Sequence, residues 1–166
     1  ITKKNSIKKK IDKYSFFFRE SSLIINATGD LGEIKEISNL DLKKFEKTVN
    51  VNFLSNLVII QKILQLKKKN KRLSIILFSG GGVTNYRKNF TAYSISKLAL
   101  VKLVEIVSKE IKNKFIQINA ISPGIIQSNM IDKTLQNRKL VEKEEIKKIK
   151  LQVSYSYKTV DKLYKG

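Results

Sequence analysis

Short apolar runs alternate along the chain with longer segments in which apolar residues recur every three or four positions. Each run is followed closely by glycine, as in buried parallel strands that end in a turn; the runs are 22–27, 73–78 and 115–121. Segments 41–69 and 91–112 have helical spacing, and Asp41 is placed to cap the first of them. The order strand, helix, strand, helix, strand predicts a parallel sheet with crossover helices, a doubly wound α/β fold of three layers.

The ends of the chain are more polar than its middle, and their apolar residues follow a helical pattern. Ile7 and Ile11, four positions apart, predict a short amphipathic helix. Helices are expected over 4–14, 140–151 and 159–164. We therefore expect one domain over 1–166, with 129–166 as a helical segment that follows the last predicted strand.

Composition removes several kinds of chemistry. The 166 residues contain no cysteine and no histidine, which excludes disulfides, thiolate catalysis and Ser-His or Cys-His nucleophiles. The net charge of +20 suggests nucleic acid or an anionic membrane as a partner. Only four of the 34 basic residues are arginines, however, and no aromatic residues interleave with the lysine runs. A bias of composition towards lysine, isoleucine and asparagine explains the charge, so we expect no nucleic-acid or membrane partner.

Targeting signals give no reason to place the protein in a membrane. No apolar region with a small-residue cleavage site follows the basic opening of the chain. The longest apolar stretch, 53–66, is interrupted by Ser55, Asn56, Gln61 and Lys62, and we expect that it does not span a bilayer. Cytoplasmic location is the expectation.

A tyrosine and a lysine four residues apart, Tyr93 and Lys97, carry the strongest chemical signal. This spacing puts both side chains on one face of the predicted helix, where the ammonium would lower the phenol's pKa. Such a tyrosine could protonate a carbonyl oxygen or accept the proton of an alcohol. In a chain with 30 lysines the pair also arises easily by chance. Small and polar residues after each strand, at 26–29, 79–82 and 122–128, indicate where a ligand would approach.

The order of these parts resembles the short-chain dehydrogenase/reductase family. LIINATG (23–29) resembles that family's strand ending in N-N-A-G, VNVNF carries Asn52 at the place of its active-site asparagine, Tyr93 and Lys97 match its Y-x-x-x-K pair, and INAISPGIIQSNM (118–130) resembles its segment after the next strand. The resemblance implies a Rossmann-like fold and an oxidoreductase that moves hydride between NAD or NADP and a carbonyl or alcohol.

The resemblance also assigns roles to residues. Tyr93 would be the general acid and base, Lys97 would lower its pKa and hold the ribose hydroxyls, and Asn52 would support a water-linked proton relay. Cofactor contacts are implied for Asn26, Ala27, Thr28, Gly29, Tyr93, Lys97, Pro123, Gly124, Ile126 and Ser128. No metal site is implied. The choice between NAD and NADP and the identity of the substrate stay open.

The chain departs from the family pattern near the reacting groups. The family's substrate-orienting serine stands thirteen residues before the tyrosine, where this chain has Gly80, and Ser79 lies one position earlier. Three interpretations stay open: Ser79 supplies the hydroxyl, a backbone N–H or Thr84 replaces it, or activity is impaired. Thr28 also stands where N-N-A-G has its glycine.

A second departure concerns length. The glycine-rich phosphate turn of the family, T-G-x-x-x-G-x-G, does not precede Ser22, and no final strand follows 162–166. We therefore interpret 1–166 as a partial cofactor-binding domain, inactive by itself, in which 129–166 resembles the family's substrate-covering helices. By resemblance, helices 41–69 and 91–112 would form a homodimer or homotetramer. The alternatives are a non-catalytic relic of the fold and a basic nucleic-acid-binding protein.

Overall fold

Three parallel strands form the sheet at the centre of the computed structural model, which describes residues 2–67 and 71–152. Strand β2 (Leu73–Phe78) lies between β1 (Leu23–Asn26) and β3 (Ile116–Ile121). Leu23 pairs with Ser74, and Leu73 pairs with Ile116. The predicted open parallel sheet with crossover helices is confirmed.

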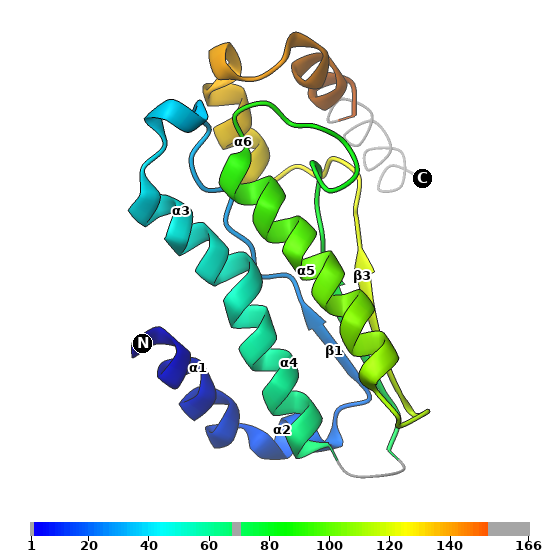
Figure 1. The fold of residues 1–166 in the computed structure, drawn as a ribbon. Helices are drawn as coiled ribbons and strands as arrows, with labels where there is room; N and C mark the ends of the chain where they lie inside the picture. Colours follow the sequence, from blue (N-terminus) through cyan, green and yellow to red (C-terminus); the bar gives the residue numbers. More distant parts are fainter. Residues whose placement is uncertain (1, 68–70, 153–166) are drawn as a thin grey trace, which may run out of the picture.

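Helices precede the first strand, connect the strands and follow the last one (Figure 1). They are α1 (Thr2–Lys13), α2 (Ser15–Glu20), α3 (Leu42–Val49), α4 (Ser55–Leu66), α5 (Thr91–Glu110) and α6 (Asn129–Gln136), with 3₁₀ turns at Ile37–Asn39 and Arg138–Leu140 and further helical residues at 143–152. The periodicity therefore located the main elements to within a few residues. The helix expected over 159–164 lies outside the described residues.

The predicted continuous helix over 41–69 contains a π-helical turn, Asn50–Leu54, between α3 and α4. The cap at Asp41 forms as expected, because its carboxylate accepts hydrogen bonds from the backbone N–H groups of Lys43 and Lys44. Ser55, the first residue of α4, donates its hydroxyl to the carbonyl of Asn50 in the turn at 2.7 Å. Side chains of this kind satisfy carbonyl groups that a wider turn leaves partly free, a feature that apolar periodicity does not reveal.

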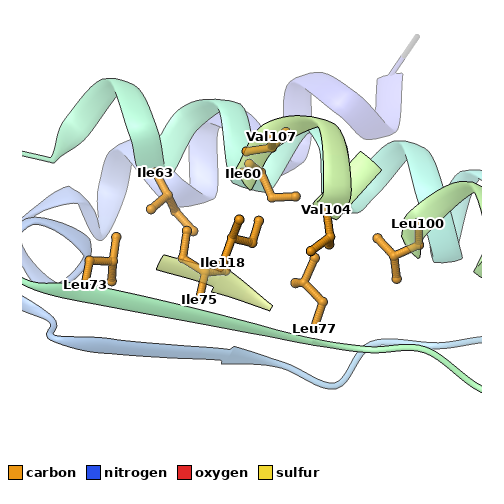
Figure 2. Close-up of a cluster of buried hydrophobic side chains, with 9 residues drawn as sticks. All are labelled: Ile60, Ile63, Leu73, Ile75, Leu77, Leu100, Val104, Val107 and Ile118. Carbon is orange, nitrogen blue, oxygen red and sulfur yellow. The ribbon is translucent and has the colours of Figure 1, made fainter. Parts of the chain in front are cut away.

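Helices α4 and α5 pack on the same face of the sheet and form the main core (Figure 2). The buried side chains are Ile60 and Ile63 of α4, Leu100, Val104 and Val107 of α5, Leu73, Ile75 and Leu77 of β2, and Ile118 of β3. Burying each such side chain stabilises the fold by about 1.5–3 kcal/mol. On the opposite face, Leu23 and Ile25 are exposed, so in the described residues the helical layer covers one face of β1.

The helical stretch Leu42–Leu66 is long and apolar enough to cross a membrane by length and composition alone. The core helix of a globular protein meets the same two criteria, and the shorter stretch 53–66 lies within this one. Its residues Ile60 and Ile63 are almost fully buried in the core described above. This packing gives the stretch a structural role against the sheet.

Candidate active site

The carboxyl ends of the three strands meet at one edge of the sheet. Asn26 pairs with Leu77, and Phe78 pairs with Ile121, so the loops after all three strands begin side by side. The backbone N–H of Ser79 continues this pairing by donating to the carbonyl of Ile121 at 2.8 Å. The three polar segments that the sequence singled out are therefore brought to the same edge.

Helix α5 places Tyr93 and Lys97 at this edge. Both side chains are buried, and the Lys97 ammonium lies 6.0 Å from the centroid of the Tyr93 ring. Lys97 Nζ donates a hydrogen bond to the carbonyl oxygen of Phe78 at 2.7 Å. A Cβ on Gly29 would lie 3.5 Å from Lys97 Nζ. The pair thus stands between the ends of β1 and β2.

Burial is the largest cause of the pKa shifts of both Lys97 and Tyr93. It lowers the pKa of Lys97 to about 8. It also raises the pKa of Tyr93, and Arg87 is the charge that opposes this rise. The net shift of the Tyr93 pKa is therefore opposite to the lowering expected from Lys97. The phenol packs among Leu31, Ile34, Phe90 and Val141, where the phenolate loses its hydration, and this loss outweighs the charge of Arg87.

Gly80 and Ser79 lie directly beside Tyr93. A Cβ on Gly80 would overlap the Tyr93 hydroxyl and would lie 2.8 Å from the ring carbon that bears it. Ser79 is buried, and among the described residues its hydroxyl is one of two buried side-chain oxygens without a hydrogen-bond partner, together with that of Ser94. Of the hydroxyl candidates weighed from the sequence, Ser79 faces the same cavity as Tyr93, and Thr84 is not among its lining residues.

A cavity of about 490 Å³ opens in front of Tyr93. The loop Ser79–Gly82 and the segment after β3 form two of its walls, and residues of α6 and of the helix at 143–152 form a third. Four of the residues assigned to the cofactor line it with Tyr93; they are Pro123, Gly124, Ile126 and Ser128. The other assigned residues are not among its lining residues: Asn26 ends β1, the loop residues Ala27, Thr28 and Gly29 follow it, and Lys97 lies one helical turn after Tyr93 on α5.

Asn52 occupies the centre of a buried hydrogen-bond network. Its Oδ1 accepts from the backbone N–H of Asp30 at 2.7 Å, and its Nδ2 donates to the Asp30 carbonyl at 2.8 Å and to Ser96 Oγ at 2.9 Å. Ser96 Oγ donates in turn to the carbonyl of Tyr93 at 2.9 Å. The Asn52 side chain therefore ties the π-helical turn to the loop after β1 and to the backbone of Tyr93.

The backbone carbonyl of Asn52 accepts a hydrogen bond from Asn56 Nδ2 at 2.8 Å. Asn56 Oδ1 accepts from Asn26 Nδ2 at the end of β1, and Asn26 Oδ1 accepts from both the N–H and the hydroxyl of Thr28. Sequence reasoning missed Asn56, although its spacing of four from Asn52 puts both on one helical face. This chain of amides links the asparagine to the loop assigned to the cofactor.

Arg87 and Glu145 are further residues that the sequence did not single out. Arg87 Nε donates to Glu145 Oε1 at 3.0 Å, and Arg87 Nη2 contacts the same oxygen. The guanidinium carbon lies 3.7 Å from the centroid of the Phe90 ring and 5.6 Å from that of Tyr93. No local pattern could show this pair, because its members are 58 positions apart.

Comparison with known proteins relates this chain to reductases. NADPH-dependent aldehyde reductase 2, a chloroplastic protein of Arabidopsis thaliana, is 29% identical over 107 residues, which are 64% of this chain and 39% of that protein. The 3-oxoacyl-[acyl-carrier-protein] reductase FabG of Buchnera aphidicola is 29% identical over 140 residues, which are 83% of this chain and 56% of that protein. The chain thus spans about half the length of these relatives or less.

Solved structures share the fold. The KRED1-Pglu enzyme superposes with a TM-score of 0.78 at 20% identity, over 92% of this chain and 63% of that one. A short chain dehydrogenase from Escherichia coli CFT073, complexed with NADPH, gives a TM-score of 0.66 at 20% identity, over 74% of this chain and 50% of that one. The sequence model of the short chain dehydrogenases matches residues 1–139. The chain therefore belongs to the short-chain dehydrogenase family.

Proposed function

We propose that the protein is an NAD(P)-dependent oxidoreductase that transfers hydride between the nicotinamide and a carbonyl or alcohol carbon. The observation that carries the proposal is the buried pair Tyr93 and Lys97, which stands at the carboxyl edge of the sheet where a cavity of about 490 Å³ opens. Family membership and the relatives named as reductases support the same reaction class.

Tyr93 is the proton donor in the direction of reduction. Because burial raises its pKa, the phenol stays protonated near neutral pH and can donate to a carbonyl oxygen in the cavity. In the direction of oxidation the same oxygen, in its phenolate form, accepts the proton of an alcohol. The cofactor, when bound, supplies or accepts the hydride, and no metal takes part in this scheme.

Lys97 and the loop after β1 fit a cofactor at this edge. The ammonium has three N–H donors, of which the Phe78 carbonyl takes one, so it can also donate to ribose hydroxyls. Gly29 has no side chain beside this ammonium, which lets a ligand approach its backbone. Asn26 and Thr28 keep that loop ordered through their mutual hydrogen bonds. The lining residues 122–126 and Ser128 would face the nicotinamide.

Ser79 supplies the hydroxyl that orients the substrate. Its Oγ is buried without a partner in the protein, and Ser79 lines the cavity with Tyr93. An unpartnered buried hydroxyl is costly in the free protein, and a substrate oxygen would satisfy it. This assignment replaces the serine expected at position 80.

The segments at 129–152 cover the substrate, since residues from α6 and from the helix at 143–152 line the same cavity as Tyr93. We also propose a homodimer through α4 and α5, whose outer sides expose Leu57, Ile95, Leu98 and Ile106. The dimer rests on the family resemblance together with these exposed apolar side chains.

The test uses the protein in its full natural length with NADH or NADPH and a panel of aldehydes and ketones. Tyr93→Phe should reduce turnover by at least about 10³-fold while cofactor affinity, measured by calorimetry, changes less than about threefold. Ser79→Ala should lower kcat/KM by about 10–100-fold, and Ser108→Ala, at an exposed serine of α5, serves as the control. Full turnover by Tyr93→Phe would contradict the proposal, and so would cofactor binding without turnover of any carbonyl in the panel.

A further inference from the structure

Arg87 is held in one position beside Tyr93 by contacts on three sides. Its guanidinium stacks on Phe90, which is fully buried. Its stem packs on the glycine loop, because a Cβ on Gly81 or Gly82 would lie 3.4 Å or 3.3 Å from Arg87 Cδ. Its Nε and Nη2 bind the Glu145 carboxylate. The Phe90 ring, the glycine backbone at 81–82 and the Glu145 carboxylate thus fix the orientation of the guanidinium.

The position of Arg87 gives its charge a direct effect on the phenol. The guanidinium carbon lies 5.6 Å from the Tyr93 ring centroid, and both residues line the cavity. The Arg87 side chain is 15% exposed and that of Glu145 is 23% exposed, so water screens the pair only partly. Arginine keeps its charge over the whole working range of pH.

We propose that Arg87 is a positioning residue for proton transfer: its guanidinium, fixed by Phe90 and Glu145, sets the proton affinity of the Tyr93 hydroxyl. Glu145 determines how much of this positive charge the hydroxyl experiences, because its carboxylate partly neutralises the guanidinium. The catalytic consequence rests on the proposed function, whereas the electrostatic relationship does not.

Other charged groups also lie around Tyr93. Lys97, on the same helix, is a second cation and is buried: its ammonium lies 6.0 Å from the Tyr93 ring centroid and donates to the Phe78 carbonyl, so its charge adds to that of Arg87. Glu142, Glu144 and Lys148 line the cavity with Glu145 but are exposed to solvent, which screens them. The lining residues from the loop after β3 and from α6 carry no charge. The burial that raises the pKa of Tyr93 is accordingly opposed by Arg87.

The direct test measures the titration of Tyr93 without turnover. Tyrosine labelled with ¹³C at Cζ gives one NMR signal for each ring, and the Tyr93→Phe variant identifies the signal of Tyr93. The titration is recorded for the unmodified protein, for Arg87→Gln, for Glu145→Gln and for Arg87→Lys. Arg138→Gln removes an arginine from an exposed 3₁₀ turn and controls for net charge.

Removing the two charges should move the Tyr93 titration in opposite directions. We expect Arg87→Gln to raise the pKa of Tyr93 by about one unit and Glu145→Gln to lower it by about half a unit. Arg87→Lys should raise the pKa of Tyr93 by less than Arg87→Gln does, since lysine keeps the positive charge but lacks the planar guanidinium and its paired N–H donors. The Arg87→Gln variant can unfold at high pH before its Tyr93 titrates. In that case the Glu145→Gln variant still tests the inference, because its Tyr93 is expected to titrate at lower pH.

Two results would overturn the inference. One is a Tyr93 pKa in Glu145→Gln that differs by less than about 0.2 units from its value in the unmodified protein, with the same result in Arg87→Gln where it can be measured. The other is an equal shift in Arg138→Gln, which would attribute the effect to net charge. The pH profile of turnover separates the inference from the proposed function. If the titration moves as expected and the turnover profile does not follow it, Arg87 acts as proposed and Tyr93 is not the acid of the reaction.

Discussion

The hydroxyl of Tyr93 packs against the α-carbon of Gly80, in the space that any side chain at position 80 would occupy. A Cβ there would lie 2.8 Å from Tyr93 Cζ and 3.1 Å from Cε1, well inside van der Waals contact. Glycine at this position is therefore what allows the phenol to reach its place in the cavity wall. The glycine that stands in place of the family's serine therefore provides the room that the Tyr93 hydroxyl occupies.

Gly80→Ala should destabilise the protein by about 1–3 kcal/mol, because the methyl group overlaps a buried ring that cannot retreat without disturbing its neighbours. Gly124→Ala is the matched control for stability, since a Cβ at Gly124 meets nothing within 4 Å. Urea denaturation measures both. Combining Gly80→Ala with Tyr93→Phe should recover part of the loss, and strict additivity would show that the two residues do not compete for this space.

Asn52→Ala should lower the free energy of unfolding by about 2–4 kcal/mol, because it removes a fully buried amide and leaves the partly buried Asp30 N–H and carbonyl without their partner. Asn50→Ala tests the same π-helical turn at an exposed asparagine, whose amide donates to the Glu46 carbonyl. We expect a loss below about 1 kcal/mol there. Equal losses in chemical denaturation would argue against a special role for the buried network.

Stability should rise with pH through the titration of Lys97. The folded protein has a Lys97 pKa of about 8 against an ordinary value of 10.5, so the unfolded chain binds more protons between these values. The contribution of Lys97 therefore improves from pH 8 to 10.5, by about 3 kcal/mol at most.

Lys97→Met removes this titration. The free energy of unfolding of the Lys97→Met variant, relative to that of the unmodified protein, should be greatest near pH 7 and should decrease towards pH 10. Lys109→Met, at an exposed position in the last turn of α5, should show no such trend. Denaturation curves at pH 7, 8.5 and 10 measure the difference, and parallel curves for the two variants would contradict a buried ammonium at Lys97.

Leu98→Glu should dissociate the proposed dimer, because it places a charge on the exposed outer side of α5, where Leu98 is 49% exposed. Light scattering during size-exclusion chromatography measures the mass. Leu42→Glu changes a more exposed leucine at the start of α3 and should leave the mass unchanged. A dimer that persists in Leu98→Glu would place the interface elsewhere.

The elements of the fold could be predicted because their signals are local. Continuous apolar runs and helical spacing located β2 at Leu73–Phe78 and the start of α5 at Thr91, as observed. The same regularity puts Tyr93 and Lys97 on one face of a helix. The π-helical turn at Asn50–Leu54 could not be predicted from this periodicity, because side-chain hydrogen bonds to the backbone, not apolar spacing, accompany it.

The sequence predicted which residues form the candidate site, but it did not predict the direction in which the pKa of Tyr93 is shifted. Burial of the Tyr93 ring among Leu31, Ile34 and Phe90 depends on contacts between segments far apart in the chain, and this burial reverses the expected direction of its pKa shift.

By itself, the sequence determined the order of strands and helices, the pairing of Tyr93 with Lys97 and the resemblance to the family, because all three depend on neighbours along the chain. Tertiary structure alone decided that Gly80 accommodates the phenol and that Arg87 meets Glu145 from 58 positions away. The physical reason is that steric fit and desolvation depend on which distant groups fill the space around an atom, and no local pattern records them.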